Sequence, residues 1–313
     1  MLHLLTTAPG SKSQGQTCRE TTPRSGVWGQ GFRDTRSQGH GYDFAMSEAS
    51  DLVASGYNAF YSMWGKSPTL RRIWRQHVTG SDYPEEFAHI SFLPLAELQA
   101  LVEGLALSAG KVLVDLACGA GGPGLWAAKE STSRLVGIDF SAMAIQRASE
   151  RVGPLGMSGK ATFRQGTFEA TGLERASADA VMSVDALQYV PDKAAALAEV
   201  ARILRPGGRF AFVAFELDLD RVLGLWDDAV SDYRPLLEEL GFGVDQYKQI
   251  PHWQEQVSAG FGAVLGDREA LEAELGEAAA AAILLEAAAT TELKPYCGHV
   301  LAVATLSSHS TPP

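Results

Sequence analysis

Two carboxylates and a run of glycines have a spacing that suits nucleotide binding. Asp115 precedes a turn that carries Gly119, Gly121 and Gly124, and Asp139 lies 20 residues after the first of these glycines. Glycine has no Cβ and tolerates positive φ, so a bound ligand can approach this backbone closely. A carboxylate can hold a cationic group or accept hydrogen bonds from hydroxyls. We interpret the stretch as a nucleotide cradle.

The elements that must position these residues are two strands and the helices after them. Residues 112–114 are apolar and largely β-branched, which is typical of a buried strand. A helix that opens at Leu125 would point its free N–H groups back at the glycine turn. A second strand over residues 134–140 contains Asp139, and Ser141 is placed to cap the next helix. This order predicts a βαβ unit.

The rest of the chain continues this alternation and then departs from it. Strands that alternate with helices imply a parallel sheet covered on both faces. We predict an α/β, Rossmann-like fold with a seven-stranded, mostly parallel sheet, helices on both faces, an antiparallel last strand and a helical lid. The further strands are expected over residues 161–164, 178–184, 209–215, 243–250 and 298–305.

The composition changes along the chain and suggests five parts. Residues 1–45 are polar and aperiodic, so they cannot bury enough apolar surface to fold alone. Met46 begins the first segment with a helical pattern, which raises the hypothesis that translation starts there. The expected parts are a disordered tail or misassigned start (1–45), an N-terminal helical lid (46–110), the nucleotide-binding core (111–250), an insertion long enough for two helices that covers the substrate site (251–291), and the last strand with a tail (292–313).

Composition also restricts the partners. The chain has 26 Lys and Arg against 37 Asp and Glu, a formal net charge of -11, which disfavours nucleic acid. Its three cysteines, Cys18, Cys118 and Cys297, are widely spaced and form no C-x-x-C pair, which argues against a zinc site or a disulfide framework. No apolar run approaches the roughly 20 residues that span a bilayer. We expect a soluble, cytoplasmic monomer or homodimer that binds no metal.

The glycine spacing alone leaves the ligand open. Gly119, Gly121 and Gly124 satisfy G-x-G-x-x-G, which by itself indicates a nicotinamide dinucleotide. A dinucleotide fingerprint has no acid inside it, whereas Asp115 stands four residues before Gly119, and the chain has no recognisable hydride-transfer constellation. Asp115 suits a ligand with a cationic amino group. S-adenosylmethionine has such a group at this end and NAD lacks it.

These motifs, in this order, resemble the class I S-adenosylmethionine-dependent methyltransferases. The resemblance is greatest to the small-molecule branch of ubiquinone and menaquinone biosynthesis enzymes and natural-product methyltransferases. It is carried by Asp-Leu-Ala-Cys-Gly-Ala-Gly at 115–121, Val-Gly-Ile-Asp-Phe-Ser at 136–141 and the Pro-Gly-Gly turn at 206–208. Ala117 stands where the family has its first glycine. The resemblance implies that the core binds S-adenosylmethionine.

The resemblance also assigns cofactor contacts. It implies that Asp139 accepts hydrogen bonds from the ribose hydroxyls and that Phe140 packs on the adenine. Thr167 falls where the family has an Asp that accepts from the adenine amino group. The predicted cofactor-binding residues are Asp115, Ala117, Gly119, Gly121, Asp139, Phe140, Gly166, Thr167, Phe168, Val184 and Tyr57.

Candidates for the transfer chemistry follow the third and fourth strands. Glu169 and Asp185 are carboxylates that could act as a general base, and we favour Glu169 because its loop can face the acceptor pocket. Exposure to solvent is the alternative for Glu169. Arg71 and Arg75 lie one helical turn apart and could hold an anionic group, or form a solvated helix face. The predicted substrate contacts are Trp64, Arg71, Arg75, Tyr189 and Trp253.

Together these features predict a methyltransferase that moves the methyl group of S-adenosylmethionine to oxygen, nitrogen or carbon of a small molecule in secondary or specialised metabolism. Two alternatives remain from the sequence. One is an NAD(P)-dependent oxidoreductase that uses the same glycine turn, and the other is a noncatalytic cofactor-binding protein.

Overall fold

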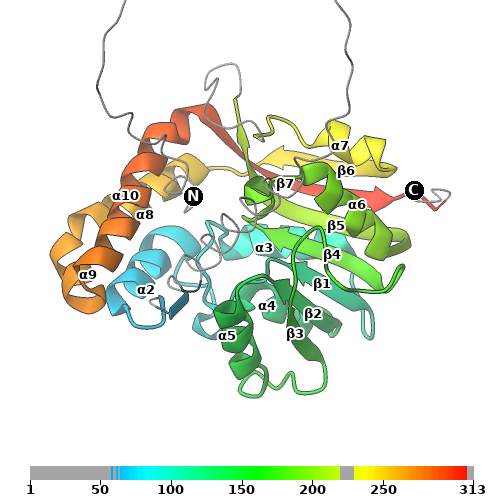
Figure 1. Cartoon of the computed structure of the whole chain (residues 1–313), viewed down its shortest axis with the longest axis horizontal. Coiled ribbons are helices and arrows are strands. Elements are labelled where there is room, and N and C mark those ends of the chain that lie inside the picture. The colour runs from blue at the N-terminus through cyan, green and yellow to red at the C-terminus, as the bar shows by residue number, and fades with distance from the viewer. Residues whose placement is uncertain (1–57, 59–60, 63, 219–228, 309–313) are drawn as a thin grey trace, which may run out of the picture.

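The structure is a computed structural model that describes residues 58, 61–62, 64–218 and 229–308. Figure 1 shows a central twisted sheet with helices on either side and a group of helices beyond one end of it. Tyr57, one of the predicted cofactor contacts, lies outside the described residues.

One seven-stranded sheet forms the centre of the fold, in the order β3-β2-β1-β4-β5-β7-β6. Strand β7 runs antiparallel to both of its neighbours, and the other neighbouring pairs are parallel. The predicted sheet, including its antiparallel last strand, is confirmed. The strands are β1 (Val112–Leu116), β2 (Arg134–Asp139), β3 (Ala161–Gln165), β4 (Ala178–Val184), β5 (Leu204–Leu217), β6 (Phe242–Gln249) and β7 (Cys297–Leu306).

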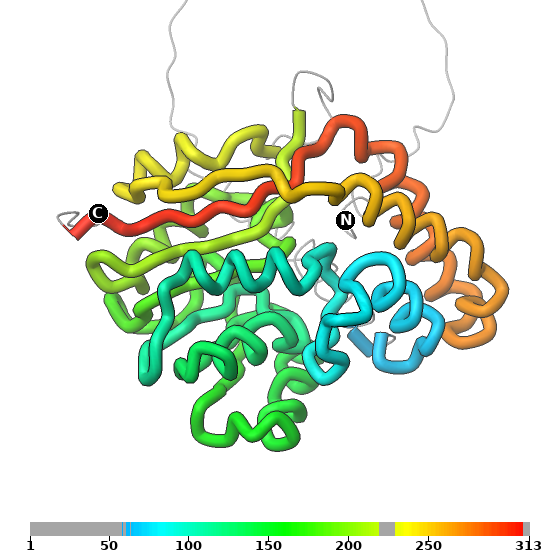
Figure 2. Tube along the Cα trace, turned by 180° about the vertical axis from the view of Figure 1, so that it is seen from behind, coloured from blue at the N-terminus to red at the C-terminus, as the bar shows by residue number. Residues whose placement is uncertain are grey.

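Helices cover both faces of the sheet because successive strand residues point to opposite sides. On β1, Leu113 joins one apolar core while Val114 and Leu116 join the other. Figure 2 shows α3 running across the face seen from behind. The helices packed on the sheet are α3 (Leu95–Leu105), α4 (Gly122–Ser131), α5 (Ala142–Val152), α6 (Lys193–Ile203) and α7 (Arg234–Glu239).

Four helices from distant parts of the sequence form a separate group, which we call the helical cap. The Glu274 carboxylate accepts hydrogen bonds from the hydroxyls of Ser67 and Thr69, at 2.5 and 2.6 Å. Trp74 packs edge-on against Phe261, with ring centroids 6.1 Å apart. These contacts join an early helix to the insertion before β7. The cap consists of α2 (Pro68–Trp74), α8 (Trp253–Gly266), α9 (Arg268–Leu275) and α10 (Glu277–Leu293).

Two details of the sequence prediction are wrong. The insertion holds three helices rather than two, because the chain breaks after Gly266 and again at Gly276, whose φ is 83°. Helix α4 begins at Gly122 instead of Leu125, because Gly121 adopts a left-handed N-cap conformation and Pro123 occupies the first turn.

The described residues contain neither a membrane-spanning helix nor a cluster of metal-binding side chains. No helix there is long and apolar enough to cross a membrane. The same part of the chain holds no group of three or more His, Cys, Asp or Glu residues arranged to hold a metal ion.

Candidate functional site

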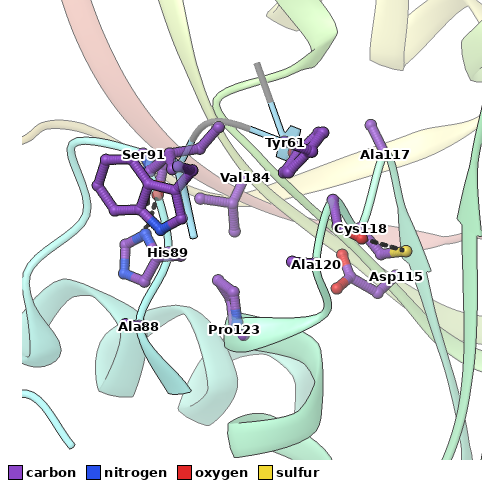
Figure 3. Close-up of a pocket in the computed structure, with 14 residues that line it drawn as sticks. Tyr61, Ala88, His89, Ser91, Asp115, Ala117, Cys118, Ala120, Pro123 and Val184 are labelled. Atoms are coloured by element: carbon purple, nitrogen blue, oxygen red, sulfur yellow. Dashed lines mark hydrogen bonds between the residues drawn. The ribbon is translucent and has the colours of Figure 1, made fainter. Parts of the chain in front are cut away.

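A pocket opens where β1 ends beside β4. At this point the strand order changes direction, with β2 and β3 on one side of β1 and β4 on the other. Such switch points are the usual ligand sites of open α/β sheets. The glycine turn forms one wall and a loop before α3 forms the opposite wall (Figure 3). The pocket is lined by Tyr61, Trp64, Ala88, His89, Ile90, Ser91, Asp115, Ala117, Cys118, Gly119, Ala120, Gly122, Pro123 and Val184.

The glycine turn has the backbone that its sequence demands. Gly119 and Gly121 have φ values of 53° and 77°, in the left-handed region that favours glycine. Ala117 also adopts positive φ, at 54°, where the family usually has glycine. A Cβ on Gly119 would collide with the hydroxyl of Tyr61, so the Tyr61 side chain packs directly on the backbone of this turn. Tyr61, which the sequence prediction did not name as a cofactor contact, lines the pocket.

Asp115 presents an unpaired acceptor at the pocket. Its side chain is 2% exposed, and its Oδ2 has no hydrogen-bond partner among the described residues. Gly124 leaves room for this carboxylate, because a Cβ there would overlap Oδ2. Burial and, to a smaller extent, the nearby Asp139 carboxylate raise the pKa of Asp115 to about 8, against the opposing effect of the Gly124 N–H. A cationic ligand group would supply the missing partner and restore the charged form.

Asp139 is held by backbone amides on both sides. Its Oδ2 accepts from the Gly119 N–H at 2.8 Å, and its Oδ1 accepts from the Ser141 N–H at 2.9 Å. Burial raises the pKa of Asp139 to about 6, and these two N–H groups oppose that shift. Each oxygen keeps lone-pair capacity for another donor, as two neighbouring hydroxyls would need. Ser141 caps α5 as predicted, and its hydroxyl also donates to Asn58 at 2.6 Å.

The loops after β2 and β3 bring the remaining predicted cofactor contacts to the same edge. The Gly166 N–H donates to the carbonyl of Asp139 at 3.1 Å. Phe168 is buried, whereas Phe140 is partly exposed. Thr167 is exposed, and its hydroxyl oxygen accepts from the Ala170 N–H at 3.1 Å. These positions border the Asp139 end of the cradle.

The opposite wall includes a histidine that sequence reasoning missed. His89 lies in the loop before α3, and its Nδ1 accepts from the Ser91 N–H at 3.2 Å (Figure 3). Burial lowers the pKa of His89 to about 4, so the ring is neutral at pH 7 and adds no positive charge to the pocket. Nothing in the spacing of His89 marks it, because its place depends on a loop that folds back over the glycine turn.

The predicted substrate contacts divide between the pocket and the cap. Trp64 lines the pocket and packs edge-on against Trp74, with ring centroids 5.3 Å apart. Trp253 opens α8 and is buried. The Arg75 guanidinium donates to the carbonyls of Ser81 and Tyr83, and Arg71 donates to the carbonyl of Gly65. Neither arginine is among the pocket-lining residues, and Tyr189 ends a short 3-10 turn after β4.

The two predicted general bases have different surroundings. Glu169 is partly exposed, and no hydrogen bond or ion pair holds its carboxylate within the described part of the chain. The Asp185 carboxylate lies between the Phe92 N–H and Nε2 of His299, at 2.7 Å from each. His299 is 114 residues from Asp185 in sequence and on β7, so no local pattern links the two.

Comparisons with known proteins agree with this geometry. Residues 114–212 match the family described as methyltransferase domain. The chain is 26% identical over 221 residues to 27-O-demethylrifamycin SV methyltransferase of Amycolatopsis mediterranei (strain S699), covering 64% of this chain and 79% of that protein. It is 29% identical over 147 residues to methyltransferase GfsG of Streptomyces halstedii, covering 45% of this chain and 52% of that protein.

A solved structure shares the fold over most of its length. The cyclopropane synthase MmaA2 from Mycobacterium tuberculosis superposes with a TM-score of 0.62 at 15% identity, covering 80% of this chain and 98% of that one. The sheet order and the buried acid ahead of a glycine turn define a Rossmann-like nucleotide-binding protein. Residues 114–212 thus match a methyltransferase domain, and the relatives support a class I S-adenosylmethionine-dependent methyltransferase of the small-molecule branch. The oxidoreductase alternative has no support among these relatives.

Proposed function

We propose that this chain is a cytoplasmic enzyme that transfers the methyl group of S-adenosylmethionine to a small molecule of specialised metabolism. The small molecule binds between the carboxyl edge of the sheet and the helical cap. The unpaired Oδ2 of Asp115 is the observation that carries the proposal. A buried carboxylate oxygen without a donor is costly unless a ligand supplies one. The cationic amino group of S-adenosylmethionine does so.

The other residues of the cradle fit the rest of the cofactor. We assign the ribose hydroxyls to Asp139, whose two oxygens are already oriented by the N–H groups of Gly119 and Ser141. Phe140, Gly166, Thr167 and Phe168 surround the adenine position in this assignment. Ala117 and Val184 line the pocket, Gly121 holds the turn in its left-handed conformation, and Tyr61 covers Gly119.

Methyl transfer requires mainly that the acceptor and the methyl donor are aligned and that water is excluded from the site. When bound, S-adenosylmethionine supplies a methyl group on a positively charged sulfur, and that charge is lost as the acceptor bonds to the methyl carbon. Aromatic side chains such as Trp64 and Tyr61 favour the cationic sulfur by cation–π attraction. The helical cap serves to exclude water and to align the acceptor. Arg71 on α2 and Arg75 just after it remain our proposed contacts for an anionic acceptor group. We also propose that the protein is a monomer or a homodimer.

Calorimetry of the full chain tests the cofactor assignment. We expect S-adenosylmethionine and S-adenosylhomocysteine to bind and NAD to give no heat at the same concentrations. Formation of S-adenosylhomocysteine in the presence of a panel of small hydroxylated, amine and quinol compounds then tests turnover. Binding of NAD alone would overturn the assignment. Cofactor binding without turnover across the panel would favour the noncatalytic alternative.

A further inference from the structure

Asp185 is the hub of a buried hydrogen-bonded group at the end of β4. Its φ of 51° lies in the left-handed region, which a non-glycine residue rarely adopts and which often marks functional sites. Its Oδ1 lies 2.7 Å from His299 Nε2, and its carbonyl accepts from Gln188 Nε2 at 2.8 Å. We call Asp185, Gln188 and His299 the Asp185 cluster.

His299 is held in place by more than this hydrogen bond. Its side chain is 0% exposed. The imidazole stacks on the ring of Phe215, with centroids 4.1 Å apart and planes 6° apart. The indole of Trp253, from the cap, stands edge-on with its centroid 6.0 Å away. The imidazole therefore has one fixed orientation beneath the first helix of the insertion.

The hydrogen bonds define which atoms of the cluster are unused. A carboxylate only accepts, so the neutral His299 ring carries its proton on Nε2 and has a lone pair on Nδ1. A carbonyl also only accepts, so the Gln188 atom that faces the Asp185 carbonyl is the amide nitrogen, and Oε1 is the other end. Among the described residues, both His299 Nδ1 and Gln188 Oε1 are buried without a partner.

Two buried acceptors without donors point to a ligand that donates hydrogen bonds. Their location relates them to methyl transfer. Val184 and Ser91 both line the cofactor pocket (Figure 3). Their chain neighbours Asp185 and Phe92 are joined to each other by the Phe92 N–H, which donates to Asp185 Oδ2. The cluster therefore lies one residue along the chain from the pocket lining, both on β4 and on the loop that covers it, although none of its three side chains is itself a lining residue.

We propose that His299 is the proton acceptor of the reaction, that Asp185 is its positioning residue, and that the acceptor substrate is a small molecule with a hydroxyl group. This inference rests on the proposed methyltransferase function. The acceptor oxygen forms a bond to the methyl carbon while the bond from carbon to sulfur breaks and its electron pair stays on sulfur. The hydroxyl proton moves to Nδ1 of His299. The products are a methyl ether, S-adenosylhomocysteine and an imidazolium beside the Asp185 carboxylate.

Burial supports this role in two ways. Phe215 and Trp253 pack around the imidazole and exclude bulk water from it. The base therefore acts on a desolvated hydroxyl, where electrostatic interactions are stronger than in water. The Asp185 carboxylate fixes the tautomer in which Nδ1 is free, and it stabilises the imidazolium that forms. Gln188 Oε1 is available to accept a second hydrogen bond from the acceptor.

A chromophoric hydroxyl probe tests the inference directly. We would saturate the full chain with S-adenosylhomocysteine and titrate in 4-nitrophenol at a pH below the probe's own pKa, recording the visible absorbance of its phenolate. The wild-type protein is expected to ionise the bound probe. His299→Gln keeps a donor for Asp185 but has no base, and we expect the ionised fraction of bound probe to fall at least about tenfold. His252→Gln, an exposed histidine paired with Glu255, is the matched control and should behave as wild type.

The outcomes separate the two proposals. Two results overturn the base assignment while the methyltransferase function stands. One is normal binding of S-adenosylhomocysteine with equal amounts of phenolate in wild type and His299→Gln. The other is a wild-type protein that binds S-adenosylhomocysteine but leaves the bound probe un-ionised. Failure of wild type to bind S-adenosylhomocysteine overturns the function itself. If His299→Gln does not fold, imidazole nitrogen NMR of wild type decides: an unprotonated Nδ1 with a protonated Nε2 is expected, and a protonated Nδ1 in the unliganded protein overturns the inference.

Discussion

Replacing Asp115 by Asn should make the unliganded protein more stable and the cofactor complex weaker. Burial raises the pKa of Asp115 from 3.8 to about 8, so at pH 7 the folded state must bind a proton that the unfolded chain has lost. At about 1.36 kcal/mol per pKa unit, over the roughly three units between 3.8 and pH 7, this costs about 4 kcal/mol. Asn removes that cost and introduces amide donors without partners, at about 1–3 kcal/mol.

The net gain at pH 7 is therefore about 1–3 kcal/mol, and its pH dependence identifies its origin. Because the folded pKa is raised, the stability of wild type is complete below pH 3.8 and declines as the pH rises towards about 8. The advantage of Asp115→Asn should thus grow between pH 5 and 7, by about 2.7 kcal/mol, and level off above pH 8.

Urea unfolding of wild type and Asp115→Asn at pH 5, 7 and 8 measures this difference. Asp245→Asn, an exposed acid on β6, is the matched control and should show no such trend. Affinity for S-adenosylhomocysteine should fall about 10- to 100-fold in Asp115→Asn, because a hydrogen bond to a charged group is lost. A variant that is less stable than wild type at pH 7 and 8, or a difference that does not vary with pH, refutes the reasoning.

Three further predictions concern the same site. At pH 7 binding of S-adenosylmethionine should release about 0.9 proton, because Asp115, with a pKa of about 8, is mostly protonated before the ligand's amino group binds to it. Calorimetry in buffers of different ionisation enthalpy measures the number of protons released, and zero release contradicts the prediction. Gly124→Ala should weaken cofactor binding at least about tenfold, because its Cβ displaces the Asp115 carboxylate, whereas Gly262→Ala, which meets nothing within 4 Å, should not. Glu169→Gln should leave both cofactor affinity and turnover unchanged if His299 takes the proton; a loss of turnover alone would assign that role to Glu169.

The cradle could be predicted from the sequence because its parts are local. Asp115 is the second-last residue of β1 and Asp139 the last residue of the adjacent β2, and each is followed within a few residues by the turn or cap that it needs. The carboxyl ends of parallel neighbours meet at one edge, so order along the chain was enough to bring them together. The start of α4 was missed by three residues, since the left-handed Gly121 and Pro123 begin the helix earlier than its apolar pattern does.

The proposed acceptor side could not be predicted from the sequence because its contacts join distant segments. The cap depends on Glu274 reaching Ser67 across 207 residues, and the Asp185 cluster depends on His299, which enters on the last strand. Neither pairing produces a periodic pattern in the sequence. The third helix of the insertion was missed because Gly276 breaks a stretch whose Ala, Glu and Leu content favours helix throughout.

The most direct test of the account compares two ligands on two proteins. S-adenosylhomocysteine carries the amino acid part of the cofactor, and 5′-methylthioadenosine has the same adenosine and thioether but lacks the amino acid part with its cationic amino group. Calorimetry should show that wild type prefers S-adenosylhomocysteine and that Asp115→Asn loses about tenfold or more of this preference, with its affinity for 5′-methylthioadenosine unchanged. The same preference in both proteins would contradict the claim that the buried Asp115 carboxylate holds the amino group of the methyl donor.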